Sequence, residues 1–253
     1  MLKYRRMFKK NKKKEVTTLA LEHRVCRLPR ATTEEGIQSG PTYLRDMTWR
    51  IFRIMAEFVE GFEFLSETSR EITFFGSARL SSESKWYKEA EKLGRMLGEC
   101  GFTIITGGGP GIMEAGNKGA KEVGAMSIGL NIELPREQRQ NDYVTRGRGF
   151  HYFFTRKVML AASSQAYVYF PGGIGTLNEF YEIIELIQTK KMQAIPVVLV
   201  GKEYWSGLIQ WMRDVPFQHM NMLDKEDFDM FTIVDSAAEA FDLVSDTPER
   251  TLF

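Results

Sequence analysis

Cysteine and histidine are scarce in this sequence of 253 residues. Only two cysteines are present, Cys26 and Cys100, and the three histidines stand far apart, at positions 23, 151 and 219. Two cysteines cannot build a disulfide framework, and neither residue type is spaced as zinc ligands are. We therefore expect a protein of a reducing cytoplasm, with no metal site.

Long apolar stretches are also missing. The sequence has no run of about 18 apolar residues, which a transmembrane helix would need, and no apolar segment of the kind found in secretory signal peptides near residue 1. Hydrophobic residues make up 43% and charged residues 26%. This composition is typical of a globular protein and excludes a wholly disordered or fibrous chain.

Acidic residues are absent from residues 1–14, which hold eight lysines and arginines. The remaining chain has 26 basic against 33 acidic residues, a net charge of −7. A mildly acidic body is a poor nucleic-acid-binding surface, because neutralising phosphates requires a basic face. We expect the basic segment to be a solvated tail, since blocks of like charge rarely fold. Contact of this tail with RNA or an anionic membrane is the alternative.

The periodicity predicts three regions along the chain. Residues 1–40 lack sustained periodicity and are expected to be mostly irregular. Apolar residues recur every three or four positions across 41–68, which predicts an amphipathic helical extension, and Pro41 suits its first position. This helix is too apolar to stand alone, so we expect it to pack on the main domain, to extend a subunit contact or to cap a pocket. Residues 69–253 form the main domain.

Short apolar runs alternate with helical patterns throughout the main domain. We predict strands at 72–75, 102–106, 125–130, 143–146, 166–170, 195–200 and 231–234, and helices at 83–100, 112–123, 150–163, 176–189, 203–214 and 236–244, with a polar loop at 131–142. Several strands are continuous apolar runs, which indicates burial on both faces. The pattern predicts an α/β fold, a doubly wound parallel sheet with three layers.

Three of the predicted strands are followed by glycine-rich turns, at 76–78, 106–111 and 171–176. Parallel strands place all three turns at one edge of the sheet, where ligands bind in such folds. Glycine lets the backbone approach a ligand closely, and each following helix presents unpaired N–H groups to an anion. The turns therefore predict a phosphate site, although Gly76-Ser77 alone could be only a tight connection.

The glycine patterns do not match two common nucleotide fingerprints. A Gly-x-Gly-x-x-Gly frame from Gly109 places Glu114 at the third glycine, and no Gly-Lys-Ser/Thr follows either long cluster. The turns therefore favour a mononucleotide or a sugar phosphate over NAD or ATP.

Charged residues near the third turn could perform chemistry. Glu179 lies on the first turn of the helix after this cluster, and Glu182 lies one turn further on the same side. Arg156 and Lys157 lie on the predicted helix before the strand at 166–170 and could neutralise a phosphate. Each also has an interpretation without a function. Glu179 could simply complement the positive end of the helix dipole, and the two cations could be ordinary solvated surface charges.

The segment from Pro171 to Glu179 reads PGGIGTLNE and matches the PGGxGTxxE signature of the LOG ("lonely guy") family. These are cytokinin-activating phosphoribohydrolases, long mislabelled as lysine decarboxylases. Arg156-Lys157 resembles the Arg-Lys pair of this family, the run from Gly107 to Met113 resembles its GGG-x-G-(I/L)-M turn, and Gly76-Ser77 resembles its first-strand turn. The resemblance covers roughly residues 70–210, and the helical extension looks like that of longer bacterial members.

The resemblance implies a Rossmann-like homodimer or higher homo-oligomer that hydrolyses the N-glycosidic bond of nucleoside 5′-monophosphates without a cofactor. It implies catalytic roles for Arg156 and Glu179. With the glycine-turn reasoning, it gives a set of expected substrate- and phosphate-binding residues: Gly76, Ser77, Gly107, Gly108, Gly109, Gly111, Met113, Lys157, Gly172, Gly173, Gly175, Thr176 and Glu182. Arginine could hold the phosphate or assist the departing base, and both roles stay open.

Two departures from the short plant-type members leave the base open. Phe153-Phe154-Thr155 replaces a Met-His-x sequence before Arg156, and Glu114 replaces a glycine. AMP and isopentenyladenine ribotide are both compatible substrates. A non-catalytic nucleotide-binding or sensing module is the alternative function. A true lysine decarboxylase is disfavoured, because no lysine lies in a motif that would hold pyridoxal phosphate.

Overall fold

The computed structural model describes residues 42–133 and 140–250. The predictions for residues 1–40 and for half of the 131–142 loop, residues 134–139, lie outside these residues. The chain divides into two compact units, Met1–Met47 and Thr48–Phe253. The described part of the first unit is the beginning of helix α2 (Thr42–Ser66). All side chains discussed below belong to the second unit.

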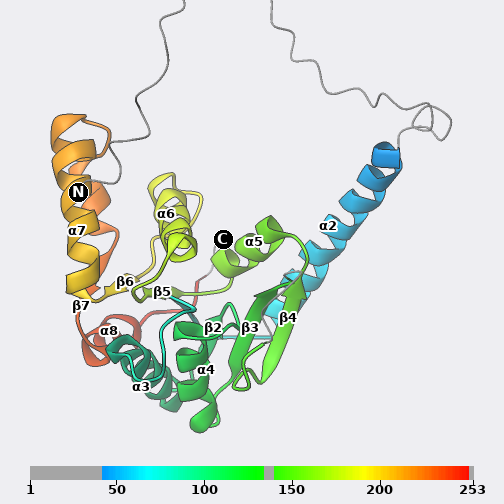
Figure 1. Cartoon of the computed structure of the whole chain (residues 1–253), viewed down its shortest axis with the longest axis horizontal. Coiled ribbons are helices and arrows are strands. Elements are labelled where there is room, and N and C mark those ends of the chain that lie inside the picture. The colour runs from blue at the N-terminus through cyan, green and yellow to red at the C-terminus, as the bar shows by residue number, and fades with distance from the viewer. Residues whose placement is uncertain (1–41, 134–139, 251–253) are drawn as a thin grey trace, which may run out of the picture. The chain divides into compact units, whose positions relative to one another are not determined.

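A seven-stranded sheet forms the centre of the second unit, and all of its neighbouring strands pair in parallel (Figure 1). Its order is β4-β3-β2-β1-β5-β6-β7. The strands are β1 (Glu71–Phe75), β2 (Thr103–Thr106), β3 (Ser127–Ile132), β4 (Arg146–Phe150), β5 (Ala166–Tyr169), β6 (Val197–Val200) and β7 (Thr232–Val234). Every residue of β2, β3, β5 and β6 is buried, as their continuous apolar runs indicated. The predicted doubly wound parallel sheet is confirmed.

The prediction was wrong for the fourth strand, which was expected at residues 143–146. The strand runs from Arg146 to Phe150, and its sequence RGRGF offers a single apolar residue. It lies at the edge of the sheet and pairs with β3 alone, so only Phe150 among its five residues is buried and no apolar run marks it. The predicted 131–142 loop also starts too early, since Asn131 and Ile132 belong to β3.

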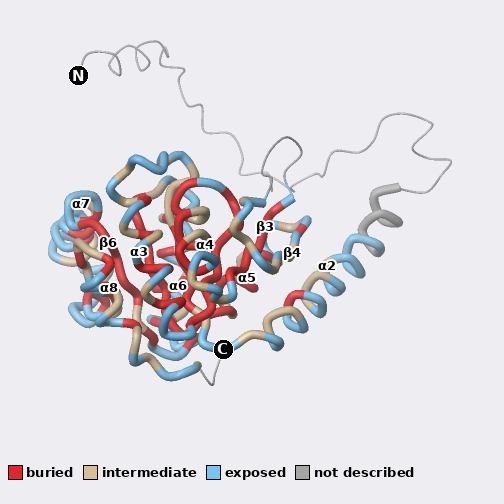
Figure 2. Tube along the Cα trace, turned by 90° about the horizontal axis from the view of Figure 1, so that it is seen from below, coloured by how far each residue is buried: buried red, intermediate tan, exposed pale blue. Residues whose placement is uncertain are grey.

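Helices cover both faces of the sheet (Figures 1 and 2). One layer holds α5 (Phe153–Ala162), α6 (Ile174–Gln188) and α7 (Lys202–Met212), and the other holds α3 (Lys85–Glu99), α4 (Ile112–Glu122) and α8 (Ala237–Val244). A π-helical turn, η1 (Arg213–His219), continues α7, and a 3₁₀ turn, η2 (Lys225–Asp229), follows it. Each layer buries its own apolar cluster against the sheet.

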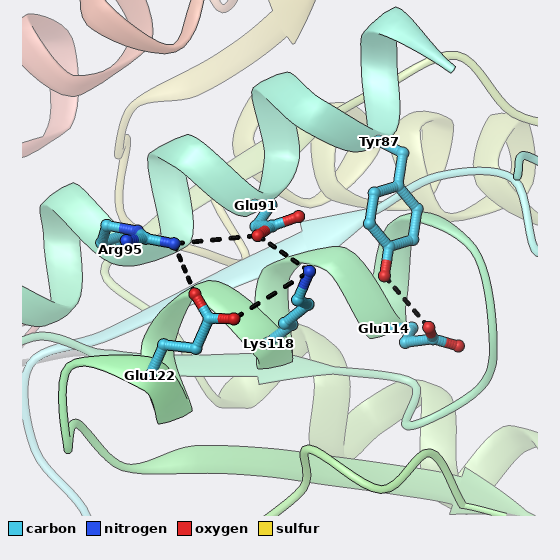
Figure 3. A network of polar contacts seen from close by, with 6 residues as sticks. All are labelled: Tyr87, Glu91, Arg95, Glu114, Lys118 and Glu122. Carbon is cyan, nitrogen blue, oxygen red and sulfur yellow. Dashed lines mark hydrogen bonds and ion pairs between the residues drawn. The ribbon is translucent and has the colours of Figure 1, made fainter. Parts of the chain in front are cut away.

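Helices α3 and α4 pack closely because glycines line their contact. A Cβ atom on Gly94 would lie 2.5 Å from the carbonyl oxygen of Gly116, so only glycine permits this approach. Figure 3 shows the polar contacts beside it, in which Arg95 and Lys118 each pair with both Glu91 and Glu122. These partly exposed pairs add little stability individually, so the contact depends on the glycine packing.

Helix α2 presents one face to the rest of the second unit. Phe58, Phe64 and Leu65 pack against the cluster under α5, and a Cβ atom on Gly61 would lie 2.5 Å from the sulfur of Met159. The opposite face of α2 is exposed and apolar. Within the described residues, none of the helices combines the length and apolar character that crossing a membrane requires.

Candidate functional site

The three glycine-rich turns meet at the carboxyl ends of β1, β2 and β5. Strand β1 lies between β2 and β5, so the chain leaves β1 in one direction and returns through β5 on its other side. This is the topological switch point, where open α/β sheets bind ligands. The Ser77 N–H donates to the Pro171 carbonyl at 3.0 Å, and the Ile112 N–H donates to the Ser77 carbonyl at 3.1 Å. These two bonds join the three turns into one platform.

A cavity of about 730 Å³ opens above this platform, a size within the range of small-molecule sites. It is lined by Phe75, Gly76, Ser77, Ala78, Arg79, Leu80, Gly107, Met113, Phe153, Arg156, Pro171, Gly172, Gly173, Ile174, Gly175, Thr176, Asn178, Glu179 and Tyr204. Ten of the residues singled out from the sequence are among them: Gly76, Ser77, Gly107, Met113, Arg156, Gly172, Gly173, Gly175, Thr176 and Glu179. The other five do not line the cavity: Gly108, Gly109, Gly111, Lys157 and Glu182.

Two of the glycines outside the cavity shape the second turn. Gly108 and Gly111 have φ values of +71° and +70°, a conformation that favours glycine. A Cβ atom on Gly111 would also lie 2.3 Å from the Ser77 carbonyl oxygen. Their structural role is therefore to let the second turn approach the first.

Two asparagine side chains, a buried one and a partly buried one, hold the second turn from behind. The side chain of Asn141 donates to the Gly109 carbonyl at 2.9 Å, and its backbone N–H donates to the Gly108 carbonyl at 2.9 Å. Asn117 accepts from Thr106 at 2.6 Å, and the Thr106 hydroxyl in turn accepts from the Gly108 N–H. Sequence reasoning missed both asparagines, because nothing in the pattern says that Asn117 of α4 and Asn141 of a distant loop meet behind the turn.

Arg156 lies at the wall of the cavity, with only 8% of its surface exposed. Its Nε donates to the Leu130 carbonyl at 2.8 Å, which fixes the plane of the guanidinium. Its Nη2 lies against Gly107, where a Cβ atom would come within 2.3 Å. Its Nη1 lies 3.7 Å from Oε1 of Glu179. The Leu130 carbonyl therefore fixes the orientation of the guanidinium, and the absence of a side chain on Gly107 leaves the space that it occupies.

Glu179 faces Arg156 from the first turns of α6 and is largely buried. Burial raises the pKa of its carboxyl from the usual 4.5 to about 7, and Arg156 only partly offsets this. Burial likewise lowers the pKa of Arg156, against the opposing pull of Glu179. A carboxyl with a pKa near 7 beside a fixed cation is a typical arrangement for acid–base or electrostatic catalysis.

Lys157 and Glu182 form a second ion pair between the same two helices, at 3.1 Å. Both groups are partly exposed, and neither lines the cavity. This pair also ties α5 to α6, since Lys157 follows Arg156 directly and Glu182 lies about one helical turn after Glu179, so the geometry gives it a supporting role.

Several lining residues were missed by sequence reasoning. Arg79 is exposed on the first turn, and no ion pair involves it among the described residues. Phe153 and Ile174 expose apolar surface at the first residues of α5 and α6. Tyr204 of α7 reaches across to donate to the Gly172 carbonyl at 2.6 Å. The cavity therefore combines one unpaired cation, a buried ion pair and apolar surface. Across residues 42–133 and 140–250, no three His, Cys, Asp or Glu side chains gather as metal ligands would.

The family comparison matches residues 113–244, slightly more than half of the chain, to the family described as "Possible lysine decarboxylase". The chain belongs to this family, the LOG family. The matched residues include the Arg156–Glu179 pair and the third glycine turn.

Three relatives show how far the sequence similarity extends. An uncharacterized protein of Archaeoglobus fulgidus is 31% identical over 52% of this chain and 84% of its own. A cytokinin riboside 5′-monophosphate phosphoribohydrolase of Rhodococcoides fascians is 25% identical over 57% of this chain and 75% of its own. A probable enzyme of the same name from rice (Oryza sativa) is 28% identical over 56% of this chain and 59% of its own.

Solved structures share the fold. The molybdenum cofactor carrier protein of Chlamydomonas reinhardtii superimposes with a TM-score of 0.52 at 22% identity, over 69% of this chain and 95% of its own. The molybdenum cofactor binding protein of Rippkaea orientalis gives a TM-score of 0.50 at 21% identity, over 69% of this chain and 93% of its own. At this identity, the likeness shows the fold alone.

Proposed function

We propose that this protein hydrolyses the N-glycosidic bond of a nucleoside 5′-monophosphate, releasing the free base and ribose 5-phosphate. The observation that carries the proposal is the buried pair of Arg156 and Glu179 in the wall of a cavity that three glycine-rich turns enclose. The names of the Rhodococcoides fascians and rice relatives support the same reaction class.

The phosphate binds against the third turn and the start of α6. The first backbone N–H groups of that helix have no partner within the helix, and its dipole favours an anion there. Gly173 and Gly175 offer open space, since a Cβ atom on either would meet nothing within 4 Å. A phosphate can therefore approach the backbone without steric conflict.

The reaction breaks the bond between C1′ of the ribose and a base nitrogen, and water supplies the oxygen that forms the new bond at C1′. The base leaves with the bonding electron pair and takes up a proton. Positive charge develops on the ribose ring on the way, as in other glycoside hydrolyses. The ionised Glu179 stabilises this charge or orients the water, and burial strengthens its effect.

Arg156 contributes a cation whose position the Leu130 carbonyl and Gly107 fix. Two roles are compatible with this geometry. The guanidinium can hold the 5′-phosphate, or it can stabilise negative charge on the departing base. In both roles the fixed orientation lowers the reorganisation that the reaction requires.

The experiment measures product release from AMP, GMP, IMP, CMP, UMP and isopentenyladenine ribotide, following free base and ribose 5-phosphate by chromatography. Arg156→Lys and Glu179→Gln test the pair, and Glu203→Gln on the exposed start of α7 is the matched control. We expect both site variants to lose roughly 10²–10⁴-fold in rate while the control retains it.

The alternative function, a nucleotide-binding module without catalysis, makes a different prediction. It requires saturable nucleotide binding with no base release from any of the six nucleotides. That result would refute the hydrolase and leave Glu179 as a binding residue.

A further inference from the structure

Helix α7 does not follow any of the three glycine-rich turns, yet one of its side chains reaches the third turn. The Tyr204 hydroxyl donates a hydrogen bond to the Gly172 carbonyl at 2.6 Å, across 32 positions of the sequence. Tyr204 lines the cavity and is 37% exposed. Within the described residues, no other side chain forms a hydrogen bond with the backbone of residues 171–175.

Three consecutive carbonyls of the third turn each accept one hydrogen bond. The pairs are the Ser77 N–H with Pro171 at 3.0 Å, the Tyr204 hydroxyl with Gly172 at 2.6 Å, and the Leu177 N–H with Gly173 at 3.1 Å. In contrast, the N–H groups of residues 172–176 have no acceptor in the part of the chain that the structure describes. A turn whose carbonyls are engaged and whose N–H groups are unpaired is arranged to bind an anion.

The peptide bond between Gly172 and Gly173 needs an external contact to keep this arrangement. In a trans peptide, the carbonyl of one residue and the N–H of the next point in opposite directions. A flip of this peptide would change the φ of Gly173 from −96° to about +84°, a region that glycine enters readily and other residues avoid. The flipped peptide would present the Gly172 oxygen where the Gly173 N–H now lies, and this oxygen would repel an anion.

We propose that Tyr204 is a positioning residue for the phosphate of the substrate, because its hydroxyl holds the Gly172–Gly173 peptide in the orientation that offers its N–H to the anion. This inference rests on the function proposed above for the choice of ligand. Tyr204 acts through the backbone rather than by donating to the phosphate, since its single hydroxyl proton is already donated to Gly172.

The tyrosine itself belongs to a firmly held part of the fold. Trp205 beside it is fully buried, and the two rings meet edge-on with 4.9 Å between their centroids. The N–H of Gly201, just before α7, donates to the Val234 carbonyl at 2.7 Å, which ties the start of the helix to β7. A contact made from a packed helix is held more accurately than one made from a loop.

The first test compares Tyr204→Phe with the parent chain by isothermal titration calorimetry. We expect the variant to bind ribose 5-phosphate about three- to tenfold more weakly, as the loss of one hydrogen bond would cause. Its affinity for adenosine, which has no phosphate, should stay unchanged. Tyr181→Phe is the matched control, because Tyr181 of α6 is also 37% exposed and its hydroxyl has no hydrogen-bond partner among the described residues.

A crystal structure of Tyr204→Phe without ligand tests the orientation of the peptide directly. We expect the Gly172–Gly173 peptide to be flipped or to occupy two orientations, while the melting temperature stays near that of the parent. If the peptide keeps the parent orientation although ribose 5-phosphate binds more weakly, the hydroxyl contacts the phosphate itself and the positioning role is wrong. An equal loss of affinity for ribose 5-phosphate and adenosine would also overturn it, because the effect would then not be confined to the phosphate.

These measurements need no turnover, so they separate this inference from the proposed hydrolysis. If no nucleotide is hydrolysed but Tyr204→Phe selectively loses affinity for ribose 5-phosphate, the hydrolase fails and the positioning role stands. If nucleotides are hydrolysed and the variant binds ribose 5-phosphate as tightly as the parent, the positioning role fails and the hydrolase stands. A parent chain that does not bind ribose 5-phosphate refutes the positioning role in either case.

Discussion

The Nη2 atom of Arg156 occupies the place where a side chain on Gly107 would begin. A Cβ atom at that position would lie 2.3 Å from it, and the sulfur of Met113 would lie within 2.8 Å. Gly107 does not have a positive φ, so space alone requires glycine there. The second glycine turn therefore does two things: Gly108 and Gly111 shape the backbone, and Gly107 admits the arginine.

Gly107→Ala should leave the fold intact and displace Arg156. The far end of an arginine can move without unfolding the chain, but a shift of about 1 Å in a catalytic group can cost about 10²-fold in rate. We expect a fall of that order in kcat/KM with little change in melting temperature.

Gly207→Ala is the control for this prediction, because a Cβ atom there would meet nothing within 4 Å in α7. Its activity should match the parent, and alanine inside a helix should stabilise it by roughly 0.5–1 kcal/mol. Equal activities of the two variants would contradict the role assigned to Gly107.

The rate should rise with pH through about 7. Burial raises the pKa of Glu179 to about 7, and the proposed role requires its ionised form. The profile of kcat/KM against pH should therefore show an acidic limb near that value, and Glu179→Gln should abolish the limb together with most of the rate. A limb near the ordinary glutamate pKa would indicate that Glu179 does not act as a buried carboxylate.

Glu179→Gln should also stabilise the protein at alkaline pH. The folded state holds the Glu179 proton more tightly than the unfolded state does, so the stability of the parent falls as the pH rises from about 4.5 to about 7. Glutamine cannot ionise and avoids this loss, which is on the order of 3 kcal/mol. We expect a melting temperature several degrees above the parent at pH 8, with the difference shrinking towards pH 5.

Glu185→Gln on the exposed side of the same helix is the comparison for stability. This substitution should leave the melting temperature unchanged at both pH values, because Glu185 is exposed to solvent. A gain in both variants would point to the helix rather than to the buried site.

Arg79→Gln should weaken the binding of the phosphate. Arg79 lines the cavity, and no described acidic side chain pairs with it. A charge-assisted hydrogen bond to an anion contributes about 1.5–3 kcal/mol, so we expect KM for a nucleoside 5′-monophosphate to rise at least about tenfold. The inhibition constant of the corresponding nucleoside, which has no phosphate, should stay unchanged. An equal rise for both would show that Arg79 contacts the base or ribose instead.

The sequence predicted the parts of this molecule that local patterns determine. The buried strands are continuous apolar runs, and their alternation with helices indicated a parallel sheet. The bounds of strand β4 were not predicted correctly, because its glycines and arginines show no apolar periodicity. Only its pairing with β3 defines the strand. The helix α6 begins at Ile174, two residues before the expected start, because the glycine turn runs directly into it.

The candidate site likewise has parts that local patterns determine and parts that depend on distant contacts. Its glycines, Arg156 and Glu179 lie in compact motifs, so the sequence could point to them. Asn141 could not be found that way, because its importance depends on a loop that returns to the back of a distant turn. Glu114 was interpreted as a departure from related sequences. In the structure it accepts a hydrogen bond from Tyr87 at 3.0 Å, which ties α4 to α3 (Figure 3).

Helix α2 lies outside the matched residues 113–244, yet it holds the beginning of the helix that carries Arg156. Glu57 accepts hydrogen bonds from the His151 and Tyr152 N–H groups and from the Thr155 hydroxyl. Two of these donors belong to the backbone just before Phe153, the first residue of α5, and the third is a side chain on its first turn. Removing the residues before 69 would therefore remove hydrogen bonds to the residues that begin α5. We therefore expect a chain that begins at residue 69 to hold Arg156 less firmly than a chain that retains Glu57.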